Sequence, residues 1–377
     1  MTYTQIHATD RTSDVVDDVD DVARLLDPDG GRVPDAMLDP WVADLSPHEL
    51  RALHRDMVLT RRVDAEGVAL QRQGQLALWA PSRGQEATQV GTAHALAEGD
   101  LVFPSYREHG VLLVRGVPAE GFVLQWRGEE PSGFDHAAVG VAPPQIIIGA
   151  QALHATGWAM GARLDGSADV AAAYFGDGAT SQGDVNEAMV FASSFQAPVV
   201  FVCTNNQWAI SEPVTVQGRF PLAGRAPGFG IPSVRVDGND VLACLAAMRG
   251  AVDRARRGEG PSFIEAVTYR MGPHTTSDDP TRYRDPAEVD RWARRDPIAR
   301  FEAFLRAEGV LDDAALAEVS AAADALAAEV RAVCIGATTR APETMFDHVY
   351  AEPHAGLDEQ RRAYADYLAG FTTGEQR

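Results

Sequence analysis

The chain contains no lysine, so all of its 33 basic residues are arginine. Enzymes that form a Schiff base through a lysine amine, including those that use pyridoxal phosphate, are therefore excluded. Acidic residues number 54 and give a net charge of −21. A surface of this sign repels nucleic acid, which argues against a nucleic-acid partner. Arginine in place of lysine also fits the coding bias of a GC-rich bacterial genome.

Cysteine and long apolar runs are scarce as well. Cys203, Cys244 and Cys334 are far apart in apolar stretches and form no C-x-x-C pattern, so we expect buried, reduced thiols. The sequence has no apolar run of the roughly 18 residues that a membrane helix needs. Its N-terminus lacks a basic segment followed by an apolar one, as a secretory leader would have. These absences predict a cytoplasmic protein with no membrane partner.

Two short polar motifs each follow an apolar segment. Ala168–Phe175 and Pro198–Thr204 are typical of buried strands, and residues 184–196 between them have helical spacing. Gly176-Asp177-Gly178 ends the first strand, and Asn205-Asn206 follows the second. The order strand, helix, strand predicts an α/β fold with a parallel sheet. The connecting helix is expected to bury Val185, Ala188, Met189, Ala192 and Phe195.

The residue types at these strand ends indicate a particular chemistry. Because ligands of open α/β sheets bind at the carboxyl ends of the strands, Asp177 and Asn206 are expected at one site. Their carboxylate and amide oxygens suit Mg²⁺, which completes its shell with water and phosphate oxygens. Gly178 lets the backbone approach a phosphate, and the next helix N-terminus favours an anion. A GDG alone is often an ordinary turn, whereas GDG with NN at this separation is similar to the thiamine diphosphate (ThDP) motif.

Three further segments carry candidate residues, each with a plainer alternative. Tyr106-Arg107-Glu108 supplies a phenol and a guanidinium that could bind a diphosphate, or it is a solvated helix start. Pro143–Gln151 (PPQIIIGAQ) enters a helix through Gly149, and its isoleucines could instead be core. Tyr269–Pro286 is a loop rich in Gly, Pro, Asp and Thr after the apolar strand Ser262–Val267. His274 in this loop is either a solvated histidine or a catalytic residue.

These segments together resemble the α subunit of the E1 component of 2-oxo acid dehydrogenase complexes. The resemblance runs from about Leu50 to Leu368 and also includes LQRQGQLALWAPSRGQEATQVG, SVRVDGNDVLA and MFDHVYAE. It implies a ThDP-binding α/β fold, ThDP and Mg²⁺ as cofactors, and oxidative decarboxylation of a 2-oxo acid with acyl transfer to lipoamide.

The resemblance also implies a role for each matching residue. Asp177, Asn206 and the backbone carbonyl of Trp208 would ligate Mg²⁺. Tyr106 and Arg107 would bind the diphosphate. The remaining expected positions are Gly178 and Ala179 at the diphosphate, Ile146 and Ile148 at the aminopyrimidine, and His274 as the catalytic residue of the loop. We expect the pKa of His274 to lie near neutrality, as acid–base catalysis requires.

The partners follow from what this chain lacks. No motif marks a glutamate for the pyrimidine ring, and in the resembled family that residue lies on a separate β subunit. We therefore expect an α₂β₂ heterotetramer that feeds a lipoyl-bearing E2 acyltransferase, with the α chain inactive alone. A branched-chain acid such as 3-methyl-2-oxobutanoate is favoured. The alternatives are pyruvate, acetoin as a distant third, and a scaffold paralogue without catalysis.

The chain divides into three predicted parts. Residues 1–45 form an acidic arm, for which a solvated tail is favoured over a mobile segment that lies on a partner. Residues 46–296 form the ThDP domain, which opens with a helix capped by Ser46 and Glu49 and includes the active-site loop 270–286. Residues 297–377 form a helical C-terminal extension.

Overall fold

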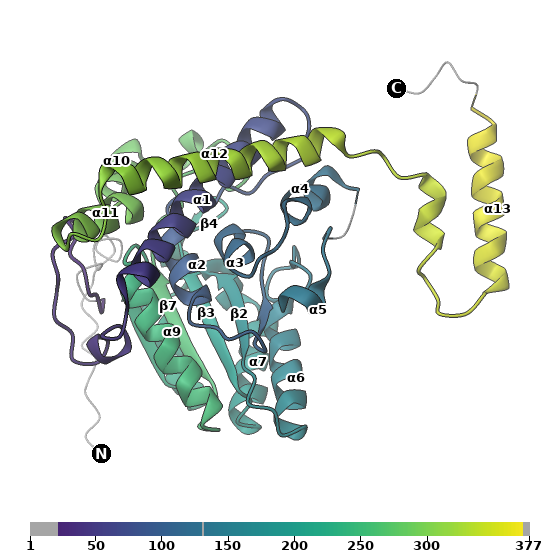
Figure 1. The fold of residues 1–377 in the computed structure, drawn as a ribbon. Coiled ribbons are helices and arrows are strands. Elements are labelled where there is room, and N and C mark those ends of the chain that lie inside the picture. Colours follow the sequence, from purple (N-terminus) through teal and green to yellow (C-terminus); the bar gives the residue numbers. More distant parts are fainter. Residues whose placement is uncertain (1–21, 130–131, 372–377) are drawn as a thin grey trace. The chain divides into compact units, whose positions relative to one another are not determined.

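A five-stranded parallel sheet forms the centre of the protein. The structure is a computed structural model that describes residues 22–129 and 132–371 (Figure 1). The strand order is β1-β2-β3-β7-β6, and every neighbouring pair is parallel. The strands are β1 Leu101–Phe103, β2 Ala171–Gly176, β3 Val199–Asn205, β6 Ser233–Asp237 and β7 Ser262–Val267, with a separate antiparallel pair β4 Trp208–Ala209 and β5 Glu212–Pro213. The predicted parallel α/β fold is confirmed.

Helices cover both faces of this sheet, which explains why the strands are apolar without alternation. Along β2, Ala172 and Tyr174 pack on one face, and Ala173 and Phe175 pack on the other. The first face is covered by α1 Pro47–Arg72, α2 Glu86–Ala93, α3 His109–Val114 and α9 Val241–Arg256, and the second by α6 Ala150–Leu164 and α7 Gly183–Ser194 (Figure 1). The shorter helices are α4 Ala119–Arg127, α5 His136–Val139, α8 Val214–Gln217 and α10 Pro286–Ala293.

Local sequence signals account for the helix boundaries. The Ser46 hydroxyl accepts the Glu49 N–H at 3.3 Å while the Glu49 carboxylate accepts the Ser46 N–H at 2.8 Å, which is the expected capping box. In α7 the expected inward residues are buried except Phe195, for which the prediction was wrong. Phe195 follows the last helical residue, is 52% exposed and stacks on Phe191.

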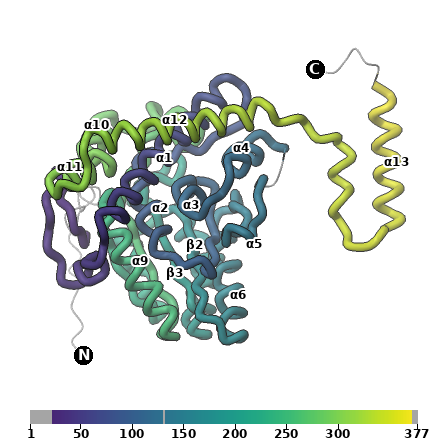
Figure 2. The backbone as a smooth tube through the Cα atoms, viewed as in Figure 1, coloured from purple at the N-terminus to yellow at the C-terminus, as the bar shows by residue number. Residues whose placement is uncertain are grey.

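The segment from residue 22 to 45 packs against the sheet domain and is not a solvated tail. Leu25 and Leu26 are fully buried, and the Asp240 carboxylate accepts both of their N–H groups at 2.6 Å. Ala23 pairs with Val236 at the free edge of β6. Figure 2 shows this segment (purple) running beside α9 and α11. Residues 1–21, the more acidic part of the predicted arm, lie outside the described residues.

Two helices after the active-site loop complete the larger of two compact units, which ends at Ile335. These are α11 Pro297–Ala307 and α12 Asp313–Gly336, joined through Gly309 at φ +67°. Helix α12 is tied to α1 by the ion pairs Arg62–Asp324 at 2.8 Å and Arg331–Glu66 at 2.5 Å. The smaller unit begins at Gly336 and contains α13 Ala355–Ala369. The boundaries at residues 45 and 296 stay predictions.

The three cysteines are free and buried, as expected. Desolvation raises the pKa of the Cys203 and Cys244 thiols well above the usual value, so both are protonated at neutral pH. None of the helices in residues 22–129 and 132–371 combines the length and apolar character needed to cross a membrane.

Candidate cofactor and metal site

Four loops at the carboxyl ends of β1, β2, β3 and β7 surround one cavity of about 250 Å³. These loops are far apart in the sequence, but the parallel sheet brings them to one edge. The lining includes almost all of the residues predicted for the site, namely Tyr106, Arg107, Ile148, Asp177, Gly178, Ala179, Asn206, Trp208 and His274. The exception is Ile146, which is 61% exposed and is not among the lining residues.

Asp177 presents a carboxylate that the protein itself does not satisfy. The residue directly follows β2 and is 1% exposed, and its Oδ2 atom has no hydrogen-bond partner among the described residues. Burial raises its pKa to about 6. A Cβ atom on the neighbouring Gly178 would lie 2.8 Å from the Cβ of Ala209, so only glycine fits this close approach. A cation at Asp177 would compensate the buried oxygen.

Asn206 and Trp208 bring further oxygen atoms to the same cavity. Asn206 follows β3 and is 6% exposed, and its Oδ1 accepts the N–H of Trp208 at 3.3 Å. The carbonyl of Trp208 accepts a hydrogen bond from Nη1 of Arg270 at 2.9 Å, which leaves one lone pair of that oxygen free. The three groups are hard oxygen donors. Among the described residues no cluster of three or more His, Cys, Asp and Glu side chains could hold a metal, so the donor set suits Mg²⁺ better than zinc.

Two buried guanidinium groups make the site electropositive. Arg107 is 4% exposed and donates to the carbonyls of Pro81 at 2.5 Å and His274 at 2.8 Å. Arg270 is fully buried and donates to the carbonyls of Trp208 and Ile210. Neither forms an ion pair with a carboxylate in the described part of the chain. Burial and the nearby Arg107 lower the pKa of Arg270 to about 10. An anionic ligand would compensate this uncancelled positive charge.

His274 lies against both guanidinium groups. Its Nδ1 atom is 3.2 Å from Nη2 of Arg107 and 3.5 Å from Nη1 of Arg270, and its ring meets Tyr106 edge-on with centroids 6.0 Å apart. Burial, followed by the charges of Arg107 and Arg270, lowers its pKa to about 3. The expectation of a pKa near neutrality was therefore wrong for the protein without ligand. Because Nδ1 faces two donors, we assign the proton of the neutral ring to Nε2.

The loop that carries His274 is held at several points. The Asp278 carboxylate accepts the His274 N–H at 2.8 Å and the Tyr283 hydroxyl at 2.5 Å. The Thr276 N–H donates to the carbonyl of Trp79 at 2.9 Å, and the Trp79 N–H donates back to the Thr276 hydroxyl at 3.0 Å. These contacts set the position of the imidazole before any ligand binds.

Two buried glutamines that sequence reasoning missed also line the cavity. Gln85 and Gln151 are each 2% exposed, and each leaves one side-chain atom without a partner in the described residues, Nε2 of Gln85 and Oε1 of Gln151. Gln85 stands directly before α2 and Gln151 lies in the first turn of α6. Both are surrounded by residues typical of helix starts. The only available signal was a polar residue beside an apolar helix face.

The isoleucine loop is more exposed than either interpretation predicted. Ile146, Ile147 and Ile148 are 61%, 71% and 40% exposed, so they are not core residues. Ile148 alone of the three lines the cavity. The loop ends at Gly149, which directly precedes α6. Its φ of +89° turns the chain beside the site.

Comparisons with known proteins identify a matching family model and similar proteins. The family model described as dehydrogenase E1 component matches residues 54–349. The chain is 48% identical over 347 residues to the 3-methyl-2-oxobutanoate dehydrogenase subunit alpha of Mycobacterium tuberculosis, covering 92% of this chain and 94% of that protein. It is 41% identical over 350 residues to the pyruvate dehydrogenase E1 component subunit alpha of Acholeplasma laidlawii, covering 90% and 99%. The corresponding Staphylococcus epidermidis subunit is 38% identical over 351 residues, covering 92% and 93%.

Proposed function

The chain belongs to the dehydrogenase E1 component family as the α chain of a 2-oxo acid dehydrogenase, and we propose that it provides the diphosphate-binding half of that enzyme's active site. The family implies thiamine diphosphate as the cofactor. The reaction is the oxidative decarboxylation of a 2-oxo acid with transfer of the acyl group to a lipoyl carrier. The single observation that carries the proposal is the unpartnered, buried Oδ2 of Asp177 in a cavity that Arg107 also lines, with Arg270 buried behind the cavity-lining His274.

In this proposal the chain binds the metal through oxygen atoms and binds the diphosphate through hydrogen-bond donors, one of which is a guanidinium. Asp177, Asn206 and the carbonyl of Trp208 would hold Mg²⁺, which would supply positive charge for a diphosphate. Arg107 and Tyr106 bind the same phosphates directly, and the N–H groups of Gly178 and Ala179 contribute where no side chain blocks the approach. A metal ion at Asp177 would neutralise the charge of this carboxylate, which would otherwise repel the anionic diphosphate.

The catalytic contribution of the chain centres on His274. Thiamine diphosphate, when bound, supplies the electron sink for decarboxylation. The neutral imidazole of His274 holds its proton at Nε2, while Nδ1 faces Arg107 and Arg270. It therefore acts first as a hydrogen-bond donor to a reacting oxygen or sulfur. A bound anion would offset the two guanidinium charges and raise the pKa, which would bring the ring into the range for proton transfer.

We infer that the enzyme needs a second chain. Among the described residues, Asp177 and Glu108 are the ones that bring carboxylates to the cavity lining. Glu108 is 4% exposed, and its Oε2 accepts the Ser105 hydroxyl at 2.6 Å. We assign Asp177 to the metal and leave Glu108 with its serine, so the acid that protonates the pyrimidine comes from a β subunit. The assembly is an α₂β₂ heterotetramer that acylates the lipoyl group of an E2 partner.

We propose a branched-chain 2-oxo acid as the substrate, with pyruvate as the alternative. The 48% identity to a 3-methyl-2-oxobutanoate dehydrogenase subunit exceeds the 41% to a pyruvate dehydrogenase subunit, over similar lengths. A methylene or two in a pocket changes discrimination by only about 1–3 kcal/mol, so identity supports the choice without deciding it.

The test is co-expression with an E1 β chain from the same genome. Decarboxylation is then measured against 3-methyl-2-oxobutanoate, 4-methyl-2-oxopentanoate and pyruvate at saturating ThDP and Mg²⁺. The proposal expects the highest kcat/KM with a branched acid. Preference for pyruvate would establish the alternative, and binding of ThDP without turnover of any of the three would support the scaffold reading.

A further inference from the structure

Gln85 is a buried side chain at the cavity with no role in the account so far. It is 2% exposed, stands directly before α2 and lines the cavity together with Arg107, Asn206 and His274. The segment before it contacts the other site loops, because the Pro81 carbonyl accepts from Arg107 and the Arg83 carbonyl accepts the Met271 N–H at 3.1 Å.

The hydrogen bonds around Asn206 determine how the Gln85 amide is oriented. The Oδ1 atom of Asn206 accepts the Trp208 N–H at 3.3 Å, so its Nδ2 is the donor that faces Oε1 of Gln85 at 3.4 Å. The opposite orientation of either amide would place two donors or two acceptors together. Nε2 of Gln85 is consequently left as a buried donor with no partner among the described residues. A buried donor of this kind is costly unless a ligand accepts from it.

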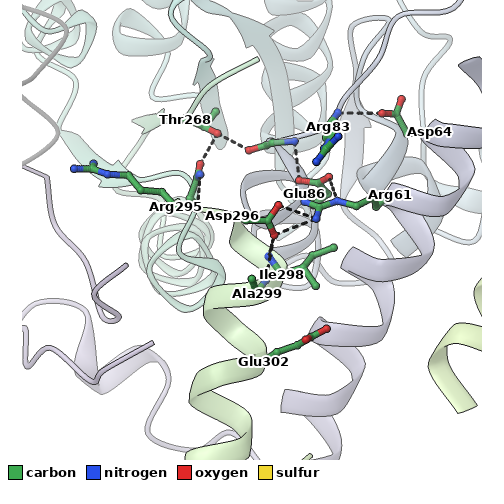
Figure 3. Close-up of polar contacts among 12 residues, drawn as sticks. Arg61, Asp64, Arg83, Glu86, Thr268, Arg295, Asp296, Ile298, Ala299 and Glu302 are labelled. Atoms are coloured by element: carbon green, nitrogen blue, oxygen red, sulfur yellow. Dashed lines mark hydrogen bonds and ion pairs between the residues drawn. The ribbon is translucent and has the colours of Figure 1, made fainter. Parts of the chain in front are cut away.

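The turn that carries Gln85 is held rigidly by buried charged groups. The Glu86 carboxylate is fully buried, accepts the Gly84 N–H at 2.9 Å and pairs with Arg61 at 2.8 Å. Arg61 also pairs with Asp296 at the start of α11 at 2.8 Å. Figure 3 shows Arg61 of α1 in contact with both Glu86 and Asp296, and Asp296 in contact with the backbone N–H groups of Ile298 and Ala299.

The same turn is also hydrogen-bonded to the residue that directly follows β7. The Thr268 hydroxyl lies 2.6 Å from the Gly84 carbonyl and 2.6 Å from Oδ1 of Asn239. Gly84 has φ +98°, and a Cβ atom there would lie 2.4 Å from the Tyr269 carbonyl. The backbone of residues 82–86 is therefore fixed, and the Gln85 amide is held in place before any ligand binds.

We propose that Gln85 has two roles at the site. It orients Asn206, which we assign to the metal, and it binds an anionic group of the cofactor or the substrate. Its Oε1 holds the Asn206 amide with Oδ1 on the metal side, and its Nε2 donates to an anionic oxygen. The acceptor is anionic because Arg107 lines the cavity without a carboxylate partner, and the buried Arg270 contacts the lining residues Trp208 and His274. The oxygen belongs to the cofactor's diphosphate or to the carboxylate of the 2-oxo acid. The inference rests on the proposed function for the identity of these ligands.

Two substitutions separate the two roles in the assembled α/β enzyme. Gln85→Glu keeps an acceptor for Asn206 but replaces the donor by negative charge, and Gln85→Leu removes both. With ThDP at a concentration that saturates each variant, we expect Gln85→Leu to raise the Mg²⁺ concentration needed for half-maximal cofactor binding, whereas Gln85→Glu leaves that concentration within about twofold. Both variants should weaken binding of the anion by roughly 10- to 100-fold, as expected for a lost hydrogen bond to a charged group, with the larger effect in Gln85→Glu.

The source of the anion follows from two readouts, the ThDP dissociation constant by calorimetry and the KM for the 2-oxo acid at saturating ThDP. If Gln85 donates to the diphosphate, its substitution raises the ThDP dissociation constant. If Gln85 donates to the substrate carboxylate, its substitution raises the KM for the 2-oxo acid. Thr92→Val serves as the matched control, because it removes a buried hydroxyl of α2 outside the cavity lining. Its thermal stability should fall with both binding constants unchanged.

The inference is overturned if both Gln85 variants bind ThDP and substrate as the wild type does. It is also overturned if they lose only thermal stability, as Thr92→Val does, since Gln85 would then be a packing residue. Tighter Mg²⁺ binding in Gln85→Glu with unchanged anion binding would contradict the donor role. Absence of ThDP binding in the wild-type assembly would instead contradict the proposed function.

Discussion

The Nδ1 atom of His274 lies 3.2 Å from Nη2 of Arg107, two residues brought together from different loops of the sheet edge. A guanidinium at this distance, with Arg270 close behind it, opposes protonation of the imidazole. The histidine is therefore neutral and has a defined tautomer. Its reactivity depends on whether an anion occupies the cavity.

We predict that His274→Ala separates the two half-reactions. Decarboxylation depends mainly on the cofactor, so it should remain measurable with an artificial electron acceptor in the α/β assembly. Acylation of a lipoyl domain needs a proton donor and should fall by roughly 10²–10⁴-fold. Equal losses in both assays would place His274 in cofactor binding or loop folding, and no loss in either would make it a bystander.

Acid should destabilise the fold through His109. This imidazole is 2% exposed, lies 2.9 Å from the Ala80 carbonyl and stacks on Trp79, and burial lowers its pKa to about 4. Between pH 6.5 and about 4 the unfolded chain binds the proton and the folded one does not. Stability is complete above pH 6.5 and is lost by up to about 1.4 kcal/mol per pH unit below it.

The measurement is denaturant unfolding of the assembly from pH 7.5 to 4.5. The slope of stability against pH should be smaller in His109→Gln, which keeps a donor toward the Ala80 carbonyl. His48→Asn, at an exposed position, should retain the wild-type slope. Identical slopes in the wild type and His109→Gln would show that other groups dominate the acid response.

Asp177→Asn should abolish cofactor binding without lowering the stability of the protein that has no ligand bound. Removing a full negative charge from a divalent site should abolish Mg²⁺-dependent ThDP binding. In the ligand-free protein the same change replaces a buried, unpartnered carboxylate oxygen by a neutral group, so the unfolding free energy should not decrease. Calorimetric titration and thermal unfolding without cofactor test the two statements. Unchanged affinity would mean that Asp177 is only a turn residue.

The buried ion pair between Arg300 and Asp237 should hold the segment from residue 22 to 45 in place. Both side chains are 1% exposed and lie 2.8 Å apart, next to the Asp240 carboxylate that caps Leu25 and Leu26. Arg300→Met should cost about 3–5 kcal/mol because it leaves Asp237 buried and unpaired.

Two further variants complete this test by denaturant unfolding. Adding Asp237→Asn to Arg300→Met should restore part of the loss, because the unpaired charge is removed. Arg306→Met breaks an exposed pair with Asp313 and should change stability little. Similar effects of the buried and exposed substitutions would contradict the account of the segment's attachment.

The parts of the site that follow strand ends were predictable from sequence. Asp177 and Asn206 are placed by two continuous apolar strands and a connecting helix of helical spacing, which are patterns that the sequence shows directly. Gln85 was missed because its neighbours read as an ordinary helix start. Its orientation depends on Asn206, far along the chain, which no local pattern reports.

Long-range charge also explains the other differences. The pKa of His274 depends on Arg107 and Arg270, and only the fold shows that all three meet. The segment containing Leu25 and Leu26 was interpreted as solvated because of the acidic residues around it. Its two leucines pack in the apolar core, and Asp240 accepts their backbone N–H groups, a contact that no local pattern indicates.

The central claim is that this chain supplies one half of a shared active site. The most direct measurement is the rate of 2-oxo acid decarboxylation, with ThDP, Mg²⁺ and an artificial electron acceptor, for the purified α chain, the β chain and an equimolar mixture. The account predicts no turnover by either chain alone and turnover in the mixture that Asp177→Asn abolishes. Robust turnover by the α chain alone would contradict it.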